Sequence, residues 1–131
     1  MRLQTRSRNI RFSSTVSGQF TIQSALSDRL VQAAKEYWKS KDLAIKSVQK
    51  PAESSNDGAM VVKFVAEGGT IWTTSFETYK KTVSVTLSGN QGETEAFVHM
   101  MLPGGLMSLE DREKAAGLIE AFYETMRAHE R

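Results

Sequence analysis

The amino-acid sequence predicts an α+β fold: a two-layer sandwich in the order strand, helix, four or five antiparallel strands, helix. Several short segments alternate apolar and polar residues, as half-buried strands do. Two longer segments instead place apolar residues at helical spacing, and both helices should cover the same face of the sheet. The 131 residues contain no internal repeat and no linker, so we expect a single domain over residues 1–131.

The N-terminal two dozen residues carry a strand pattern. In RNIRFSSTV, Ile10, Phe12 and Val16 recur at even spacing, which predicts an edge strand. Ser17-Gly18 would then make a turn, and QFTIQ would either pair back or lead into the first helix. Residues 1–24 contain four arginines, many Ser/Thr and no acid, which is also the composition of a transit peptide, but the alternation favours a strand.

Residues 24–42 predict the first helix. The segment SALSDRLVQAAKEYWKSKD repeats apolar residues at helical spacing, and Ser24 or Ser27 can serve as its N-cap. LAIKSV then predicts a strand, and the Pro, Ser, Asn, Asp and Gly residues of QKPAESSNDGA predict a loop.

The middle of the chain is rich in strand patterns. AMVVKFVAE alternates, and Gly-Gly would turn the chain into TIWTTSFETY to form a hairpin. There Trp72 and Phe76 share a face, and we expect both to anchor the sheet beneath the helices. The apolar parity changes between Phe76 and Val83, so a hairpin or a bulge must lie between them. KTVSVTLSG and TEAFVHMML predict the last two strands, joined by a turn in SGNQGE.

A sharp joint precedes the final helix, SLEDREKAAGLIEAFYETMRAHER. Pro103-Gly104-Gly105 should end the last strand, because proline cannot donate to the ladder and glycine accepts positive φ. Ser108 and Asp111 approximate a capping box. The acidic first turn opposes phosphate binding at this helix start. Gly117 or Ala121 would allow the helix to approach the sheet closely.

The last strand should have two unlike faces. Its core face should lie beneath an apolar stripe of the final helix: Ala115, Leu118, Ile119, Phe122 and Met126. Its other face should join an open sheet face that carries Lys63, Thr82, Ser84, Thr86, Phe97, His99 and Met101. A surface with an aromatic ring, a histidine, a lysine and hydroxyls is typical of a binding site, and equally of a homodimer interface.

Charge is divided unevenly along the chain. Residues 1–50 carry ten Lys/Arg against three acids, a net charge of +7, and residues 51–131 carry seven against twelve, a net charge of −5. Such a division suggests an anionic partner such as nucleic acid, a phospholipid surface or an acidic protein. The alternative is that basic and acidic elements lie side by side and cancel.

Most catalytic classes lack their motifs. The chain has no cysteine, and we find no nucleophile elbow, zinc-protease, phosphate-loop or dinucleotide-binding motif. His99 and His129 have no carboxylate at ligand spacing, so we predict no metal site and no cofactor. No run of apolar residues is long enough to cross a bilayer, and the absence of cysteine suits the cytoplasm. A non-catalytic protein is favoured over an enzyme.

The order of elements resembles the β-α-β(4)-α arrangement of TATA-binding-protein-like domains and of kinase-associated C-terminal domains. In both, two helices cover one face of a curved sheet. The order is also similar to the helix-grip fold of lipid and polyketide binders, which has two short helices and six strands in the middle. We use these resemblances only to ask which face could bind a ligand.

Three functional hypotheses follow. The first is a non-catalytic module that binds an anionic partner through the basic N-terminal half and the open sheet face, with these binding residues: Arg6, Arg8, Arg11, Lys63, Phe97, His99 and Met101. The alternative is a carrier of an apolar small molecule between the final helix and the sheet, with this lining: Met60, Trp72, Met100 and Met107. The third is an enzyme that uses His99.

Overall fold

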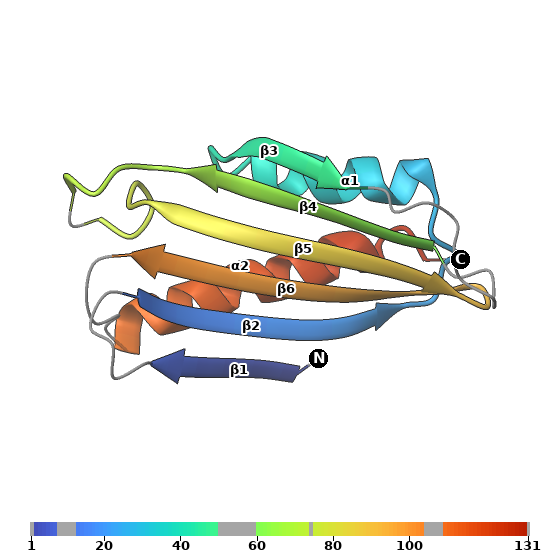
Figure 1. Cartoon of the computed structure of the whole chain (residues 1–131). Helices are drawn as coiled ribbons and strands as arrows, with labels where there is room; N and C mark the ends of the chain where they lie inside the picture. The colour runs from blue at the N-terminus through green and yellow to red at the C-terminus, as the bar shows by residue number, and fades with distance from the viewer. Residues whose placement is uncertain (1, 8–12, 50–59, 74, 104–108, 131) are drawn as a thin grey trace.

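A computed structural model describes residues 2–7, 13–49, 60–73, 75–103 and 109–130. Two strands come first, then a helix, four more strands and a long final helix (Figure 1). Their bounds are β1 Arg2–Ser7, β2 Ser13–Ile22, α1 Asp28–Lys39, β3 Ala44–Gln49, β4 Met60–Gly68, β5 Lys81–Asn90, β6 Glu93–Pro103 and α2 Leu109–Arg127.

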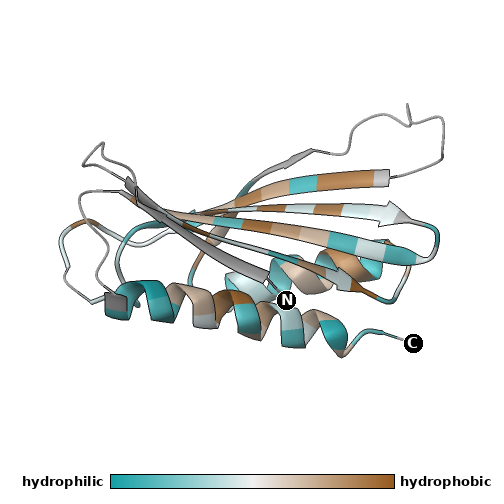
Figure 2. Ribbon diagram, turned by 90° about the horizontal axis from the view of Figure 1, so that it is seen from below, coloured by the Kyte–Doolittle hydropathy of each residue, from teal (hydrophilic) through white to brown (hydrophobic). Residues whose placement is uncertain are grey.

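The six strands form one antiparallel sheet in the order β1-β2-β6-β5-β4-β3. Both helices lie on the same side of it, and α2 runs along the sheet's length (Figures 1 and 2). This arrangement confirms the α+β two-layer sandwich.

The N-terminal segment differs in detail from its prediction, because it forms two strands instead of one. QFTIQ lies within β2 apart from its last residue, and β2 pairs with β1 on one side and β6 on the other. Ser17 and Gly18 lie inside β2, opposite His99 and Val98, so the turn predicted there is wrong. The predicted strand residues Ile10 and Phe12 lie outside the described residues.

The core fills the space between the helices and the sheet. On β5 and β6 the alternate residues Val83, Val85, Val98 and Met100 are fully buried, as the alternation predicted. From α2, four side chains cover this face and are themselves fully buried: Ala115, Ile119, Phe122 and Met126. Burial of a large apolar side chain contributes about 1.5–3 kcal/mol, so this layer supplies much of the driving force for folding.

Helix α1 begins where the sequence predicts it. The Ser27 hydroxyl accepts a hydrogen bond from the Leu30 amide (3.2 Å), which identifies Ser27 as the N-cap. The helix buries Tyr37 and Trp38 near its C-terminal end. The chain then turns at Asp42, whose φ of 63° lies in the left-handed region, and enters β3.

The described residues 70–73 and 75–79 do not form the predicted strand. Gly69, with a φ of 86°, turns the chain out of β4, and the Thr70 amide donates to the Thr78 carbonyl to close a loop (3.0 Å). Trp72 is 88% exposed on this loop, whereas Phe76 is buried. The prediction that both rings anchor the sheet is therefore wrong for Trp72, because alternation cannot show that a segment leaves the sheet.

The joint before α2 lies mostly outside the described residues. β6 ends at Pro103, as predicted, but the Gly104-Gly105 turn and the Ser108 cap fall within residues 104–108. The turn predicted in SGNQGE is present, with positive φ at Gln91 and Gly92.

Candidate functional site

The middle of the helix–sheet interior is packed with aromatic rings. The ring of Phe122 lies 5.6 Å from that of Phe20 and 5.3 Å from those of Tyr37 and Trp38, centroid to centroid. Met100, predicted to line a carrier cavity, is fully buried in this core, and Trp72 is exposed. The lining predicted for an apolar carrier is therefore wrong at Trp72. Met107 lies outside the described residues.

A pocket opens to the surface at one end of the same interior. A pocket of about 410 Å³ lies between the end of α1, the loop before β5, and α2, and we call it the helix–loop pocket. Its lining residues are Ser40, Lys41, Asp42, Leu43, Phe76, Glu77, Lys81, Lys114, Gly117 and Leu118. Leu43 and Phe76 are buried and Leu118 is half-buried, so the pocket combines an apolar floor with charged groups.

Close packing of backbone holds one wall of the pocket in place. The Asp42–Leu43 segment lies directly against the end of β4, where a Cβ on Gly68 would sit 2.6 Å from the Asp42 carbonyl oxygen. Only glycine fits such an approach. On the other side, the Tyr37 hydroxyl donates to the Leu118 carbonyl (2.6 Å) and joins α1 to α2. Burial raises the pKa of Tyr37 to about 12.

Lys81 is the buried charge in this pocket. It begins β5 on the face covered by the helices, in series with Val83 and Val85, and is only 5% exposed. Its ammonium donates to the Phe76 carbonyl and to the Tyr79 carbonyl (3.0 Å), and it lies 4.4 Å from the centroid of the Phe76 ring. Desolvation lowers the pKa of Lys81, against the opposing attraction of Glu77 and Asp111.

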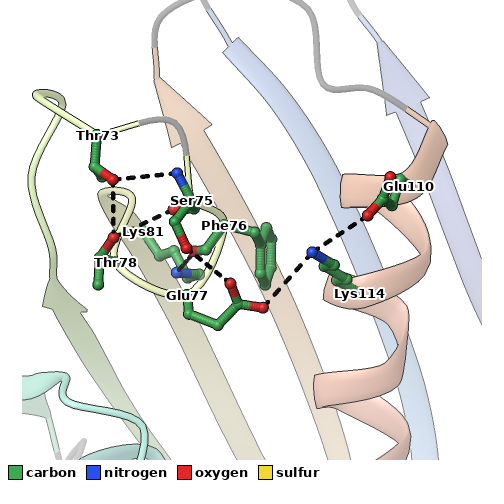
Figure 3. A network of polar contacts seen from close by, with 8 residues as sticks. All are labelled: Thr73, Ser75, Phe76, Glu77, Thr78, Lys81, Glu110 and Lys114. Carbon is green, nitrogen blue, oxygen red and sulfur yellow. Dashed lines mark hydrogen bonds and ion pairs between the residues drawn. The ribbon is translucent and has the colours of Figure 1, made fainter.

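The loop that carries Phe76 is held by a chain of polar contacts that ends on α2 (Figure 3). The Ser75 hydroxyl donates to Glu77 (2.8 Å), and Glu77 pairs with Lys114 (3.7 Å), which also pairs with Glu110 (3.4 Å). The Glu77 pKa is lowered by its own backbone N–H, then by Ser75 and Lys114, and the Glu77 carboxylate raises the pKa of Lys114. These exposed ion pairs position the loop beside α2 and add little stability.

Gly117 of α2 faces this hollow instead of the sheet. It is exposed, and a Cβ built on it meets nothing within 4 Å. The prediction that Gly117 or Ala121 allows a close helix–sheet approach is therefore wrong, since both are exposed. Lys81 and Gly117 were not among the predicted site residues. The even spacing of Lys81 with Val83, Val85 and Leu87 was a usable signal that this lysine faces the helices.

The open face, the sheet surface that carries no helix, gathers four of the predicted binding residues. Lys63 of β4 and Phe97 of β6 both lie opposite Thr86 of β5, in one cross-strand row. Phe97 is 50% exposed and Met101 is 37% exposed. Between them on β6, the His99 Nδ1 atom lies 3.0 Å from the Ser17 hydroxyl.

The described basic residues of the N-terminal half lie on separate elements of the fold. Arg6 lies in the edge strand β1, opposite Thr15, and Arg8 and Arg11 lie outside the described residues. Helix α1, with its lysines, contacts β3 and β4 at the other edge of the sheet and on the covered face. The strand that carries Arg2 and Arg6 and the helix that carries Lys35 and Lys39 therefore lie toward opposite edges of the sheet, and binding of an anion by the basic residues stays a prediction.

Within the described residues, no group of three or more His, Asp or Glu side chains could hold a metal ion. No helix in the described part of the chain is both long enough and apolar enough to cross a membrane.

The fold resembles a Bet v 1-like α+β sandwich. It is similar to the crystal structure of Ara h 8.0201, with a TM-score of 0.54 and 12% sequence identity. The likeness covers 89% of this chain and 97% of that chain. No protein-family model and no curated protein matches the sequence.

Proposed function

We propose that the protein binds an apolar small molecule in the helix–loop pocket. The observation that carries the proposal is a pocket of about 410 Å³ whose floor includes the buried side chains of Leu43 and Phe76, at one end of the helix–sheet interior. Ligand pockets range from about 300 to 1,000 Å³ and combine apolar walls with a few polar groups. A Bet v 1-like fold is consistent with this role. The site replaces the Met-lined cavity that the sequence suggested.

Gly117 supports the proposal independently. Glycine inside a helix costs about 0.8–1 kcal/mol relative to alanine. No neighbouring atom requires a glycine here, because a Cβ would project into open space. A small residue at this position does keep the pocket volume free, which a larger side chain would fill. A binding role thus gives a reason for a residue that packing does not explain.

The direct test is a titration with decanoate, a short-chain amphipathic molecule, followed by two-dimensional amide NMR. We expect saturable shifts at Leu43, Phe76 and Gly117, around the pocket. Phe20 and Met126, in the packed part of the interior, serve as internal controls and should not move. An absence of saturable shifts, or shifts centred on the packed part, would contradict the proposal.

A second candidate is self-association through the open face. The charges there do not favour a polyanion, because Lys63 shares the central part of this face with the half-buried Glu67 and the exposed Glu95. They do favour a second copy. In the sheet register, the row of His99 lies midway between the row of Lys63 and Phe97 and the row of Glu67 and Met101.

Two copies could therefore stack face to face, related by a two-fold axis that runs along the His99 row between the two sheets. Lys63 would then lie over Glu67 of the second copy, and Phe97 would lie over Met101 of the second copy. With strands about 4.8 Å apart and alternate residues about 6.8 Å apart, six strands and four rows give roughly 780 Å² on each copy. That is close to the roughly 800 Å² per partner of a standard interface. The prediction of an anionic partner remains for the β1 edge, where Arg2 and Arg6 lie.

Charge exchange tests the second candidate. By sedimentation, Lys63→Glu alone and Glu67→Lys alone should each weaken the dimer, because like charges would then meet across the axis. The double exchange should restore it. Equal association of all four proteins, or a monomeric wild type at high concentration, would rule out this pairing.

A further inference from the structure

We infer that the helix–loop pocket selects a ligand with an anionic head group, such as a carboxylate, and that the Lys81 ammonium binds that group. The inference rests on the proposed function and specifies the chemical class of its ligand. The apolar part of such a ligand would lie against Leu43, Phe76 and Leu118, which line the same pocket.

The position of Lys81 is the first argument. Positions 83, 85 and 87 of the same strand face carry valine, valine and leucine, all fully buried. A lysine in this series places a charge where the fold otherwise uses hydrocarbon, and burial of an ammonium is unfavourable without a strong partner. An anion is the partner that best offsets this cost.

The present partners of Lys81 leave room for such a group. An ammonium has three donors, and the carbonyls of Phe76 and Tyr79 accept two hydrogen bonds from it. Neutral carbonyl oxygens solvate the charge but do not neutralise it. Lys81 is among the residues that line the pocket, so its side chain borders the space that a ligand would enter.

The surrounding charges also favour an anion. Glu77 is the acid of the loop, and it already pairs with Lys114 of α2. The end of α1 contributes Lys41 and Asp42, and Asp111 of α2 acts on Lys81 from a distance. Among the charged residues that line the pocket, three are lysines and two are acids, so the lining itself carries a net charge of +1.

The role of Lys81 predicts a pH dependence. In the free protein, desolvation holds the pKa of Lys81 below the ordinary value of 10.5. A bound carboxylate stabilises the ammonium and raises that pKa. Affinity for a carboxylate should therefore be constant at neutral pH and fall as the pH rises through the lowered pKa of the free protein. Affinity for a neutral ligand should lack this fall.

The experiment compares three ten-carbon ligands by calorimetry: decanoate, decan-1-ol and decyltrimethylammonium. At pH 7 the wild type should bind decanoate at least tenfold more tightly than decan-1-ol, and the cation most weakly. Lys81→Met keeps the length of the side chain and removes its charge, so it should bring decanoate and decan-1-ol to similar affinity. Lys80→Met is the matched control, because Lys80 is the exposed sequence neighbour of Lys81 and lies outside the described lining of the pocket, and it should preserve the preference.

The outcomes separate the two proposals. If the wild type binds decan-1-ol and decanoate equally, the pocket binds small molecules but the head-group inference is wrong. The same conclusion follows if Lys81→Met retains the preference, or if Lys80→Met loses it equally. If none of the three ligands binds, the proposed function fails and this inference with it. Should Lys81→Met not fold, the wild-type pH profiles decide: parallel profiles for decanoate and decan-1-ol overturn the inference.

Discussion

The interface between α2 and the rest of the molecule has two regions that differ in side-chain packing. In the middle, Phe122 contacts three aromatic rings and is fully buried. Toward the N-terminal part of the helix, Gly117 presents no side chain, and the space beside it remains open. On this one helix, Phe122 in the closed core and Gly117 beside the pocket are five positions apart.

The difference shows which residues serve stability and which leave room for a ligand. Protein interiors are normally packed to crystal-like density, so a hollow bordered by buried apolar side chains is a departure from the rule. In this chain the hollow coincides with a buried lysine and a helical glycine, which are both unfavourable for stability alone. Their presence at one end of the interior distinguishes a candidate site from the core beside it.

The largest effect should come from the filled region. Phe122→Ala removes the ring that joins the aromatic cluster, and such truncations cost about 3–5 kcal/mol through lost burial and a residual cavity. We expect this loss in the free energy of unfolding measured with urea. A cost below about 1 kcal/mol would mean that the middle of the interior is not closely packed, and the contrast with the hollow end would disappear.

A smaller effect of opposite sign should come from the hollow region. Gly117→Ala should raise the free energy of unfolding by up to about 1 kcal/mol, because alanine favours the helix and its Cβ meets open space. The same urea measurement applies. A clear destabilisation would show that Gly117 is needed for packing, and would remove it as support for the pocket.

The sequence predicted the layers and the strand faces because those features are local. Alternation in β4, β5 and β6 and the apolar stripe of α2 each repeat over several residues, so a single exception does not hide them. Prediction from alternation failed for the segment that contains Trp72 and Phe76. Its rings have the spacing of a strand face, but hydrogen bonds between Thr70 and residues 78–80 close it into a loop.

The candidate site could be predicted only in part. The open face with Lys63, Phe97, His99 and Met101 follows from strand parity, and the structure brings these residues onto one surface. The helix–loop pocket joins segments near residues 42, 77 and 117, and no pattern within one element reveals that they meet. The absence of a close neighbour at Gly117 likewise depends on tertiary packing.

The central claim is that the hollow end is a ligand site, and Gly117→Phe tests it most directly. A phenylalanine should fill the pocket without breaking the helix, and circular dichroism can confirm that the fold is retained. We predict that decanoate binds the wild type and Gly117→Ala with similar affinity by calorimetry, and Gly117→Phe at least tenfold more weakly. Equal affinity of a folded Gly117→Phe variant for decanoate would contradict the claim, because the ligand would then bind elsewhere.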